Sequence, residues 1–459
     1  MDHPRDAARA SGPDRRSVKT PPEAARGWQP SRAYVYYATG VVFLVSVFNI
    51  VDRLVVSMVG PQIASDLSLS DTQLGLLLGP SFAVVHFVAI LPMAWLADRT
   101  ARRVVIAAGL LAWSGMTALG GAAQGFGQLF ATRMGVGIGE AAGAPPSVSL
   151  LTDTVPASMR ARALSSITIG SIMGIGVGLV VGGFLASAYG WRTTLIAVGL
   201  PGVLVAALVR FTLREPPRSR PARETASPLG AARHLFGLPS YRWMVAGAAL
   251  AGIASVGRNL WEPTFLTRVY GFEPSRIGMQ LFLFGALPTA LGAYVGSTLS
   301  DRLAPRDERW PLWVCAIGNG AAAPLLVGFA LWPEDARLGG DLPAALAFLS
   351  AGGFFLGFFS APTASVAQSL ATPNMRALSH AIWSMLLTLV GQGVGAAAIG
   401  ALAEQLAASA GENAIRYALA AASSLAAVSG GAYLRAARQL PADLARVAGA
   451  PEPAAAGSG

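Results

Sequence analysis

The chain is built from long runs of apolar residues that are separated by short polar clusters. Hydrophobic residues make up 53% of the 459 residues and charged residues only 13%, which is about half the charged fraction of a typical soluble protein. A helix needs about 20 predominantly apolar residues to cross a bilayer, and the sequence contains twelve such runs. The sequence therefore predicts an all-α membrane protein with twelve transmembrane helices.

The twelve predicted spans divide into two sets of six. A polar segment rich in proline and arginine, 214–240, separates the sixth span from the seventh, and Asp98-Arg99 after the second span is repeated as Asp301-Arg302 after the eighth. Two six-helix bundles with internal pseudo-symmetry are typical of secondary transporters, whose site lies between the repeats. The predicted spans are 34–64, 73–97, 103–124, 128–152, 162–188, 193–213, 242–268, 276–300, 311–332, 343–370, 377–403 and 414–436.

This division predicts five segments along the chain. They are an N-terminal cytoplasmic tail at 1–33, an N-terminal six-helix bundle at 34–213, a cytoplasmic linker at 214–240, a C-terminal six-helix bundle at 241–436 and a C-terminal cytoplasmic tail at 437–459.

The positive charge indicates how the chain is oriented. The net charge is +10, and every basic residue except Lys19 is arginine. The arginines gather in the N-terminal tail, in the linker and in the loops after even-numbered spans, whereas the loops after odd-numbered spans have few. Because cytoplasmic loops of membrane proteins carry the excess of basic residues, we expect both termini in the cytoplasm. The arginine-rich composition is typical of a GC-rich bacterium, so we expect an inner-membrane location.

Several classes of protein are excluded or disfavoured by composition. Lys19 is the only lysine and does not follow a glycine, so the chain has no P-loop and cannot drive transport with ATP by itself. Cys315 is the only cysteine, and the four histidines are scattered without metal-ligand spacing. Polar residues are too few for a nucleic-acid surface. We therefore expect no cofactor, no metal and no nucleic-acid partner.

Two stretches of the first half are similar to motifs of a known superfamily. The loop at 94–103 reads AWLADRTARR, which resembles the G-x-L-A-D-R-x-G-R-[RK] motif of the major facilitator superfamily, with alanine at both glycine positions. The fourth span reads RMGVGIGE at 133–140 and resembles the arginine-glycine motif of the same superfamily. The resemblance implies the major facilitator fold and transport by alternating access.

Three further stretches resemble one branch of that superfamily. They are NIVDR at 49–53, GIGEA at 137–141 and REPPR at 214–218. Together they are similar to the Spinster-like branch, whose eukaryotic members export sphingosine-1-phosphate or lysophospholipids. The second half has no motif that can be matched residue by residue, so the resemblance implies a class of cargo and not a particular one.

Four ionisable residues lie inside predicted spans of the first half: Asp52, Arg53, Arg133 and Glu140. Four charges stranded in lipid would cost about 10 kcal/mol, so they must face one another or water. Arg133 and Glu140 are seven residues apart and share one face of a helix. Asp52 and Arg53 point about 100° apart, so we expect Asp52 in the cavity and Arg53 turned towards Glu140.

We interpret these four residues as a proton-coupling cluster in which Arg133 binds the anionic group of the cargo. Burial favours the neutral form of a carboxyl group and a neighbouring arginine favours the charged form, so Asp52 and Glu140 can take up and release a proton when an anion binds. The alternative is a static ion pair that locks two helices together.

Charged residues in the loops predict a contact between the two halves of the chain. The resemblance implies that Asp98, Arg99, Arg102 and Arg103, with Asp301 and Arg302 in the weaker repeat, form a latch between the halves that breaks as the cytoplasmic side opens. The alternative is that these residues only anchor the topology, because arginines at helix ends also contact lipid headgroups.

The second half offers one charged pair and several aromatic residues. Arg258 and Glu262 are four residues apart on the seventh span, with aromatic side chains beside them. Either Arg258 contacts a cargo headgroup and the aromatics form a wall for an acyl chain, or the pair satisfies itself. The candidate wall residues are Trp261, Phe265, Phe284, Phe359 and Trp383.

These observations predict a monomeric, proton-coupled secondary transporter whose cargo is an amphipathic anionic lipid, of the lysophospholipid or sphingoid-phosphate type, or a similar organic anion. Its expected partners are this small-molecule substrate, protons and membrane lipids. One alternative is a drug or metabolite antiporter, or an organic-acid symporter, on the same scaffold. A non-transporting membrane sensor is the remote alternative. The sequence has no catalytic motif of a hydrolase or metalloprotease, so we do not expect an enzyme.

Overall fold

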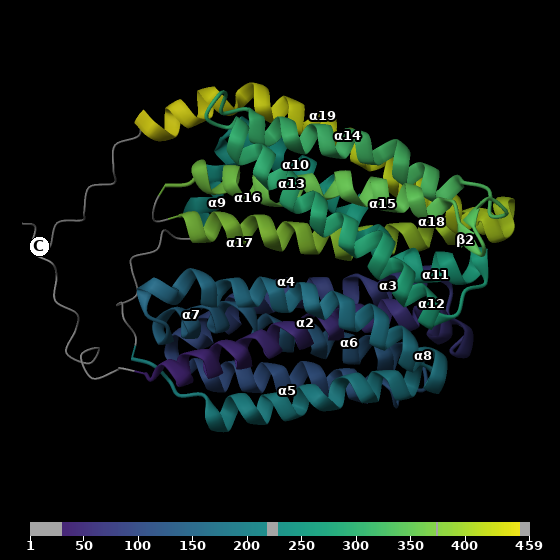
Figure 1. The fold of residues 1–459 in the computed structure, drawn as a ribbon, viewed down its shortest axis with the longest axis horizontal. Helices are drawn as coiled ribbons and strands as arrows, with labels where there is room; N and C mark the ends of the chain where they lie inside the picture. The colour runs from purple at the N-terminus through teal and green to yellow at the C-terminus, as the bar shows by residue number, and fades with distance from the viewer. Residues whose placement is uncertain (1–29, 218–227, 373–374, 450–459) are drawn as a thin grey trace, which may run out of the picture.

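The computed structural model describes residues 30–217, 228–372 and 375–449, and within these ranges it is almost entirely helical. Figure 1 shows the helices side by side with roughly parallel axes, in two groups that lie one above the other. The lower group holds α2 to α8 and the upper group α9 to α19. We call them the first and second halves.

The first half begins with α2, and its longest helix, α8, contains two of the predicted spans. Its elements are α2 (Arg32–Asp66), α3 (Asp71–Leu78), α4 (Pro80–Arg99), α5 (Arg102–Gly120), α6 (Phe126–Ala141), α7 (Ala144–Thr154), the 3-10 turn η1 (Ala157–Met159) and α8 (Arg160–Thr212).

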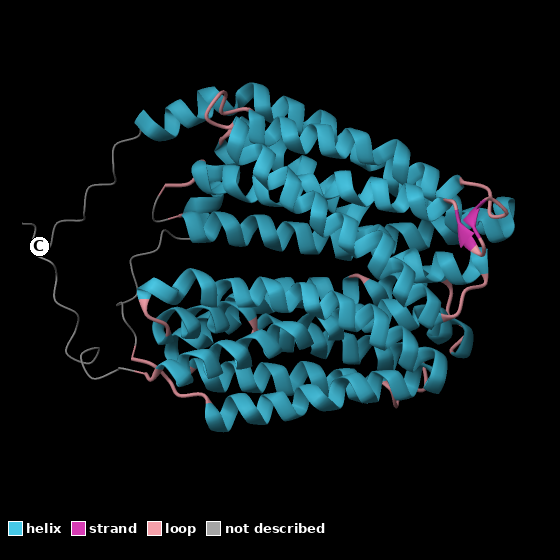
Figure 2. Ribbon diagram, viewed as in Figure 1, coloured by secondary structure: helices cyan, strands magenta, loops and turns pink. Residues whose placement is uncertain are grey.

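The second half contains three π-helical segments and the two short strands that Figure 2 shows in magenta. Its elements are α9 (Pro228–Gly237), α10 (Pro239–Gly252), η2 (Ile253–Gly257), α11 (Arg258–Tyr270), α12 (Pro274–Gln280), η3 (Leu281–Ala286), α13 (Leu287–Leu303), α14 (Trp310–Leu331), β1 (Arg337–Gly339), β2 (Leu342–Pro343), α15 (Ala345–Leu356), η4 (Gly357–Phe359), α16 (Ser360–Ser369), α17 (Arg376–Leu386), η5 (Leu387–Val394), α18 (Gly395–Ala410), η6 (Gly411–Asn413) and α19 (Ala414–Gly449). The strands pair antiparallel.

Each of the twelve predicted spans coincides with helical structure, and glycine marks several of the breaks inside them. Gly79 separates α3 from α4, and Gly143 precedes α7. Within α8 the backbone turns at Gly190, where φ is 73°. Only glycine adopts such a φ without steric cost, so Gly190 lets the fifth span turn directly into the sixth.

Eight helical segments of the described chain are long and apolar enough to cross a membrane. Two of them, Ala157–Thr212 and Leu378–Gly449, each contain two predicted spans. The predicted spans 128–152 and 242–268 fall outside the eight. They correspond to α6–α7 and α10–α11, which are interrupted and carry buried ionisable residues. Buried charges are not confined to these two crossings, because α2, which is among the eight, carries the buried Asp52.

The predicted linker and C-terminal tail both contain helical structure. Helix α9 lies within the predicted linker 214–240, and α19 continues well beyond the predicted end of the last span to Gly449. The extension of α19 is amphipathic: Ala437 and Leu440 are buried, and Asp443 accepts a hydrogen bond from the backbone N–H of Ser240 at 2.8 Å. Packing of this face against α10 explains why the helix does not stop at residue 436. Residues 1–29 and 450–459 of the predicted tails lie outside the described residues.

The two halves pack closely at one end of the molecule. We call this closed end the far end. Helix α2 begins and α19 ends at the opposite end of the molecule (Figure 1), which we call the terminal end. Three glycines bring backbones together at the far end, since a Cβ atom at Gly75, Gly183 or Gly278 would overlap with backbone atoms of the other half at Ala396, Pro274 or Leu179 respectively.

Polar contacts join the halves at the same end. Arg268 of α11 forms a bidentate ion pair with Asp71 of α3, with N···O distances of 2.6 and 2.9 Å. The carboxylate of Glu404 accepts a hydrogen bond from the Thr72 N–H at 2.8 Å, and the Ser187 hydroxyl accepts one from the Ser275 N–H at 2.9 Å. The far end is therefore closed by both packing and charge.

Candidate functional site

The structure brings together the four ionisable residues predicted in the first half. Arg53 of α2 forms an ion pair with Glu140 of α6 at 2.5 Å, and the Glu140 side chain is completely buried. Arg133 lies on α6 about two turns before Glu140, and its Nη1 donates to the backbone oxygen of Asp52 at 3.5 Å. We call these four residues the charge cluster. Two arginines and two carboxylates make its formal charge zero.

The cluster is packed against one aromatic ring. The guanidinium carbon of Arg53 lies 4.8 Å from the centroid of the Phe82 ring, and that of Arg133 lies 5.8 Å from it. His86, one turn along α4, stacks on the same ring and contacts the Gly137 carbonyl oxygen through Nδ1 at 3.3 Å. His86 is therefore held between Phe82 and α6. Because the Phe82 ring offers no conventional hydrogen-bonding group, it cannot satisfy the hydrogen-bonding groups of the charged side chains that it contacts.

Asp52 faces a different direction from the one expected. It is fully buried, and its Oδ2 accepts a hydrogen bond from the Ser114 hydroxyl of α5 at 3.1 Å. Its Oδ1 has no hydrogen-bond partner among the described residues. Because Asp52 and Arg53 point about 100° apart, the arginine reaches α6 and the aspartate turns into the first half instead of the space between the halves. Ser114 was not identified from the sequence, although it and Thr117 are polar residues one turn apart in an apolar span.

Arg133 keeps unused hydrogen-bonding capacity although it is buried. Its Nε has no partner among the described residues, and its single hydrogen bond to the Asp52 backbone is long. Glu140 also has unused hydrogen-bonding capacity, because its Oε1 is buried without a partner among the described residues. A buried guanidinium has up to five donors and is costly to leave unsatisfied. The cluster can therefore accept an anion or a proton without first losing all of its internal bonds.

Arg258 in the second half is saturated by contrast, in the sense that each of its three guanidinium nitrogens has a partner. Its Nη1 is paired with Glu262, its Nε donates to the Ala254 carbonyl at 3.0 Å, and its Nη2 donates to the Asn259 side chain at 2.7 Å. Of the two interpretations of this pair, the structure favours the self-satisfied one.

The predicted aromatic wall is largely core packing in this structure. Trp261 and Phe265 are fully buried; the Trp261 Nε1 donates to the Ala396 carbonyl at 2.9 Å, and Phe265 packs edge-on against Phe329. Large rings at these positions fill the interfaces of α11 with α18 and α14. Two further candidates, Phe359 and Trp383, are buried in a second core cluster, and Phe284 is half-buried.

The loop residues are divided between two environments. Arg102 is buried and binds Asp153 at 2.5 Å and Glu215 at 2.8 Å, and the backbone N–H of Arg103 donates to Glu215 at 3.1 Å. These contacts hold α5, α7 and the end of α8 together within the first half. The other four predicted latch residues, Asp98, Arg99, Asp301 and Arg302, are exposed.

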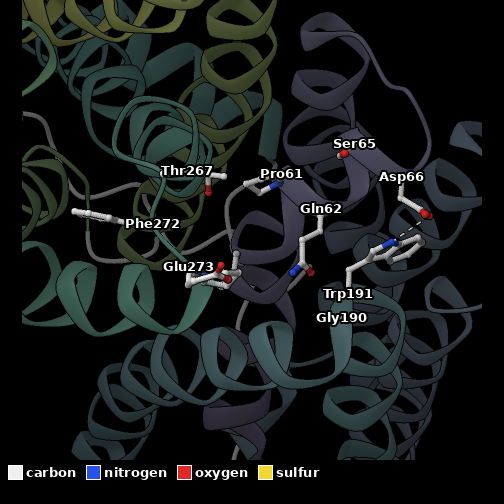
Figure 3. Close-up of a pocket in the computed structure, with 12 residues that line it drawn as sticks. Pro61, Gln62, Ser65, Asp66, Gly190, Trp191, Thr267, Phe272 and Glu273 are labelled. Atoms are coloured by element: carbon white, nitrogen blue, oxygen red, sulfur yellow. Dashed lines mark hydrogen bonds between the residues drawn. The ribbon is translucent and has the colours of Figure 1, made fainter. Parts of the chain in front are cut away.

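A separate pocket lies at the far end between the halves. It has a volume of about 530 Å³ and is lined by the end of α2, the bend in α8 and the connection between α11 and α12. Figure 3 shows Gln62 and Glu273 among the lining residues, and a dashed line marks the contact from the Trp191 Nε1 to Asp66, 3.3 Å long. No charge-cluster residue lines it. Among the described residues no group of histidine, cysteine and acidic side chains could hold a metal ion.

Comparisons with known proteins agree with the fold and with the motifs. The profile of the Major Facilitator Superfamily matches residues 42–396. The chain is 33% identical to an MFS-type efflux pump of Mycolicibacterium smegmatis, over 82% of this chain and 86% of that protein. It is 26% identical to protein spinster homolog 1 of Xenopus laevis, over 80% of this chain and 72% of that protein.

Solved structures include a bacterial homologue of the human lysosomal transporter Spinster, crystallised in an inward-facing and unoccupied conformation. It superposes with a TM-score of 0.77 and 26% identity, covering 90% of this chain and 99% of that one. The family match spans well over half of the chain and the efflux pump exceeds 30% identity. The chain is a multi-pass membrane transporter, not an enzyme, and it belongs to the major facilitator superfamily, with Spinster proteins among its relatives.

Proposed function

We propose that the protein is a proton-coupled secondary transporter that moves an amphipathic anion, of the lysophospholipid or sphingoid-phosphate type, by alternating access. The observation that carries this proposal is the buried charge cluster, in which Arg133 and Glu140 have unmet hydrogen-bonding capacity. Ionisable residues inside a membrane protein mark ion and substrate pathways. The similarity to Spinster proteins supports the choice of cargo class.

Arg133 is the proposed binding group for the anion. A guanidinium binds phosphate or carboxylate oxygens through paired donors. The Nε of Arg133 is buried without a partner among the described residues, whereas each guanidinium nitrogen of Arg258 donates to one. Phe82 beside it offers an apolar contact for the part of the cargo next to the headgroup. The self-contained Arg258–Glu262 pair then has a structural role in α11.

Charge balance links the anion to the proton. The cluster is neutral as described, so a bound monoanion would leave it at −1 in a poorly hydrated interior, where uncompensated charge is expensive. Uptake of one proton by Asp52 or Glu140 restores neutrality. An anionic cargo is therefore expected to move together with protons, whereas a cationic cargo would be exchanged for them.

We place the terminal end in the cytoplasm because the arginine-rich loops lie there, and the membrane is then a bacterial inner membrane. The closed far end seals the site from the outside. In this arrangement the exposed residues Asp98, Arg99, Asp301 and Arg302 belong to a latch that is open and that closes when the cytoplasmic ends approach. Arg102 and Arg103 support it by holding the loop in place. The two halves correspond to the two proposed bundles, in a monomer.

A second candidate function is efflux of a drug or metabolite in exchange for protons. The 33% identity to a mycobacterial efflux pump favours it. Here the carboxylates Asp52 and Glu140 would bind a cationic cargo in one half-cycle and protons in the other. The two candidates differ in the sign of the cargo and in the direction of the proton relative to it.

Transport into proteoliposomes with an entrapped pH dye separates the candidates. The protein is tested against labelled lysophosphatidylglycerol, sphingosine-1-phosphate and the cation ethidium, under a pH gradient of either direction. We expect anion flux that carries protons in the same direction as the cargo. Ethidium flux against the proton flow would favour efflux of cations, and no flux of either anion with a measurable ethidium signal would overturn the proposed cargo.

A further inference from the structure

We infer that a small polar cavity beside the charge cluster holds water and carries protons between the cluster carboxylates and the terminal end of the molecule. The second part of this inference, that the cavity carries protons, rests on the proposed proton coupling. The cavity has a volume of about 70 Å³ and lies inside the first half, between α2, α5, α7 and α8. Its polar lining comes from Ser46, Asn49, Trp113, Ser147 and Ser171.

Unpaired polar atoms indicate that this cavity is hydrated. The Trp113 ring and the Ser147 side chain are buried, yet the Trp113 Nε1 donor and the Ser147 hydroxyl have no hydrogen-bond partner among the described residues. A buried polar group is almost always hydrogen-bonded to protein or to water. A cavity of about 70 Å³ accommodates about two waters at the ~30 Å³ that each occupies in the liquid. It is too small for the headgroup of a lysophospholipid.

The cavity lies within one helical turn of the cluster on three different helices. On α2, Asn49 precedes Asp52 by three residues and Arg53 by four. On α5, Trp113 is next to Ser114, which donates to Asp52 at 3.1 Å. On the path from α6 to α7, Gly143 follows Glu140 by three residues and its N–H bonds the Glu140 carbonyl at 3.0 Å. The lining residues are therefore neighbours of both carboxylate residues along the chain, and we infer that waters in the cavity reach them.

The direction of the cavity follows from the course of these helices. The chain enters α2 at the terminal end and leaves α7 towards the same end, so Asn49 and Ser147 both lie on the terminal side of the cluster. Ala144, which also lines the cavity, is exposed. The cavity thus extends from beside the cluster to an exposed residue of α7 on the terminal side, and Arg133 does not line it.

The hydroxyl groups can support a proton relay. Ser46 and Ser171 donate to carbonyl groups of their own helices, at 3.0 Å each, and their oxygens remain available as acceptors. The charged and titratable groups that surround the relay are Asp52, Glu140, Arg53, Arg133 and, beyond Phe82, His86. Positive charge on Arg53 and Arg133 opposes an excess proton in the cavity, whereas the carboxylates of Asp52 and Glu140 attract one.

Hydroxyl-radical footprinting with short X-ray pulses tests whether water is present. The radicals form from water itself, so a buried side chain is oxidised only where a water lies beside it. Trp113 and Trp261 are a matched pair, since both are fully buried, but the Trp261 Nε1 is bonded to the Ala396 carbonyl. We expect Trp113 to be oxidised several-fold faster than Trp261. Equal slow rates for the two tryptophans would overturn the inference.

Filling the cavity tests its role. Ser147→Val removes the hydroxyl and occupies space, whereas Ser165→Val is a control on α8, because Ser165 is exposed and does not line the cavity. We expect Ser147→Val to lower Trp113 oxidation to the rate of Trp261. Gradient-driven lysophosphatidylglycerol uptake should slow about a hundredfold, the lower end of what positioned proton-transfer groups contribute. Exchange of labelled for unlabelled cargo, which needs no net proton movement, should continue.

Two results separate failure of the relay from failure of the proposed function. If Ser147→Val dries the cavity but uptake is unchanged, the relay is wrong while proton coupling stands. If the wild-type protein moves no anion with protons, the proposed function is wrong and the relay falls with it, while the footprinting ratio still decides whether the cavity is wet. Trp113→Phe, which keeps an aromatic side chain and removes the Nε1 donor, provides a second variant for the uptake and exchange assays should Ser147→Val not fold.

Discussion

At the scale of single residues, the two carboxylates of the charge cluster have unequal surroundings. Glu140 is bonded to Arg53 at 2.5 Å, whereas Asp52 forms no salt bridge among the described residues and accepts a hydrogen bond from Ser114. A carboxylate with only a neutral hydrogen-bond donor is the one that gains most from a proton in a buried site. We therefore assign Asp52 to proton binding and Glu140 to control of the Arg53 side chain.

This assignment predicts different defects for two neutral substitutions. Asp52→Asn resembles the protonated residue, so it should abolish uptake driven by a pH gradient and leave exchange of labelled for unlabelled cargo active. Glu140→Gln releases Arg53 and should impair both. The measurement is the pair of assays in proteoliposomes, with Glu262→Gln as the control for neutralising a buried, arginine-paired glutamate. Gradient-dependent uptake by Asp52→Asn at the wild-type rate would refute the assignment.

Arg133 provides the second residue-scale prediction. Lysine keeps the charge but loses the planar set of donors, so Arg133→Lys should weaken cargo binding by about tenfold to a hundredfold, the ~1.5–3 kcal/mol typical of a hydrogen bond to a charged group. The change is measured as the apparent KM for lysophosphatidylglycerol. Arg258→Lys is the matched control because Arg258 is equally buried but already saturated, and its KM should stay close to that of the wild type. Equal shifts in both variants would count against anion binding at Arg133.

At the scale of helices, close approach of backbones determines where the halves can meet. A Cβ at Gly278 would overlap with the Leu179 carbonyl of the first half, while a Cβ at Gly285, seven residues further along the same segment, would have only the tip of Leu349 at 3.9 Å. Gly278→Ala should therefore push the far end open, and Gly285→Ala should not.

Spin labels can measure this opening. Tyr189 and Leu338 are exposed residues of the first and second halves, so Tyr189→Cys with Leu338→Cys reports the separation of the far ends in a Cys315→Ser background. Electron–electron resonance distances should lengthen or broaden in Gly278→Ala and remain unchanged in Gly285→Ala. Unchanged distances in both would show that the contact at Gly278 can relax without separating the halves.

The helices themselves were predictable, because a bilayer demands about 20 apolar residues per crossing and each predicted span coincides with helical structure. The meeting of Arg53 with Glu140 also followed from helix geometry. The burial of Asp52 against Ser114 did not follow, because which of two adjacent residues faces the neighbouring helix depends on how α2 is rotated. The packing of Trp261 and Phe265 was missed for a similar reason: an apolar ring in a membrane helix suits lipid, cargo and core equally, and only tertiary contacts decide between them.

At the scale of the whole molecule, alternating access requires that the closed far end be held only weakly. Much of that end is backbone packing at glycines, and its ion pair, Asp71 with Arg268, is partly exposed. A partly exposed ion pair contributes about 0.2–1 kcal/mol. Such a contact biases the conformational equilibrium without preventing the change that transport needs.

The last prediction concerns this bias. Asp71→Asn removes the charge from the far-end pair and should increase the population with an open far end relative to the closed one by about two- to fivefold, which is ~0.4–1 kcal/mol. The Tyr189–Leu338 label pair measures the two populations. The exchanged pair, Asp71→Arg with Arg268→Asp, should restore most of the closed state because the attraction is regained, whereas Asp71→Arg alone should open the far end further through repulsion. If Asp71→Asn and Asp71→Arg both leave the far end as closed as in the wild type, the ion pair does not set the equilibrium, and the glycine contacts are then sufficient to close the far end.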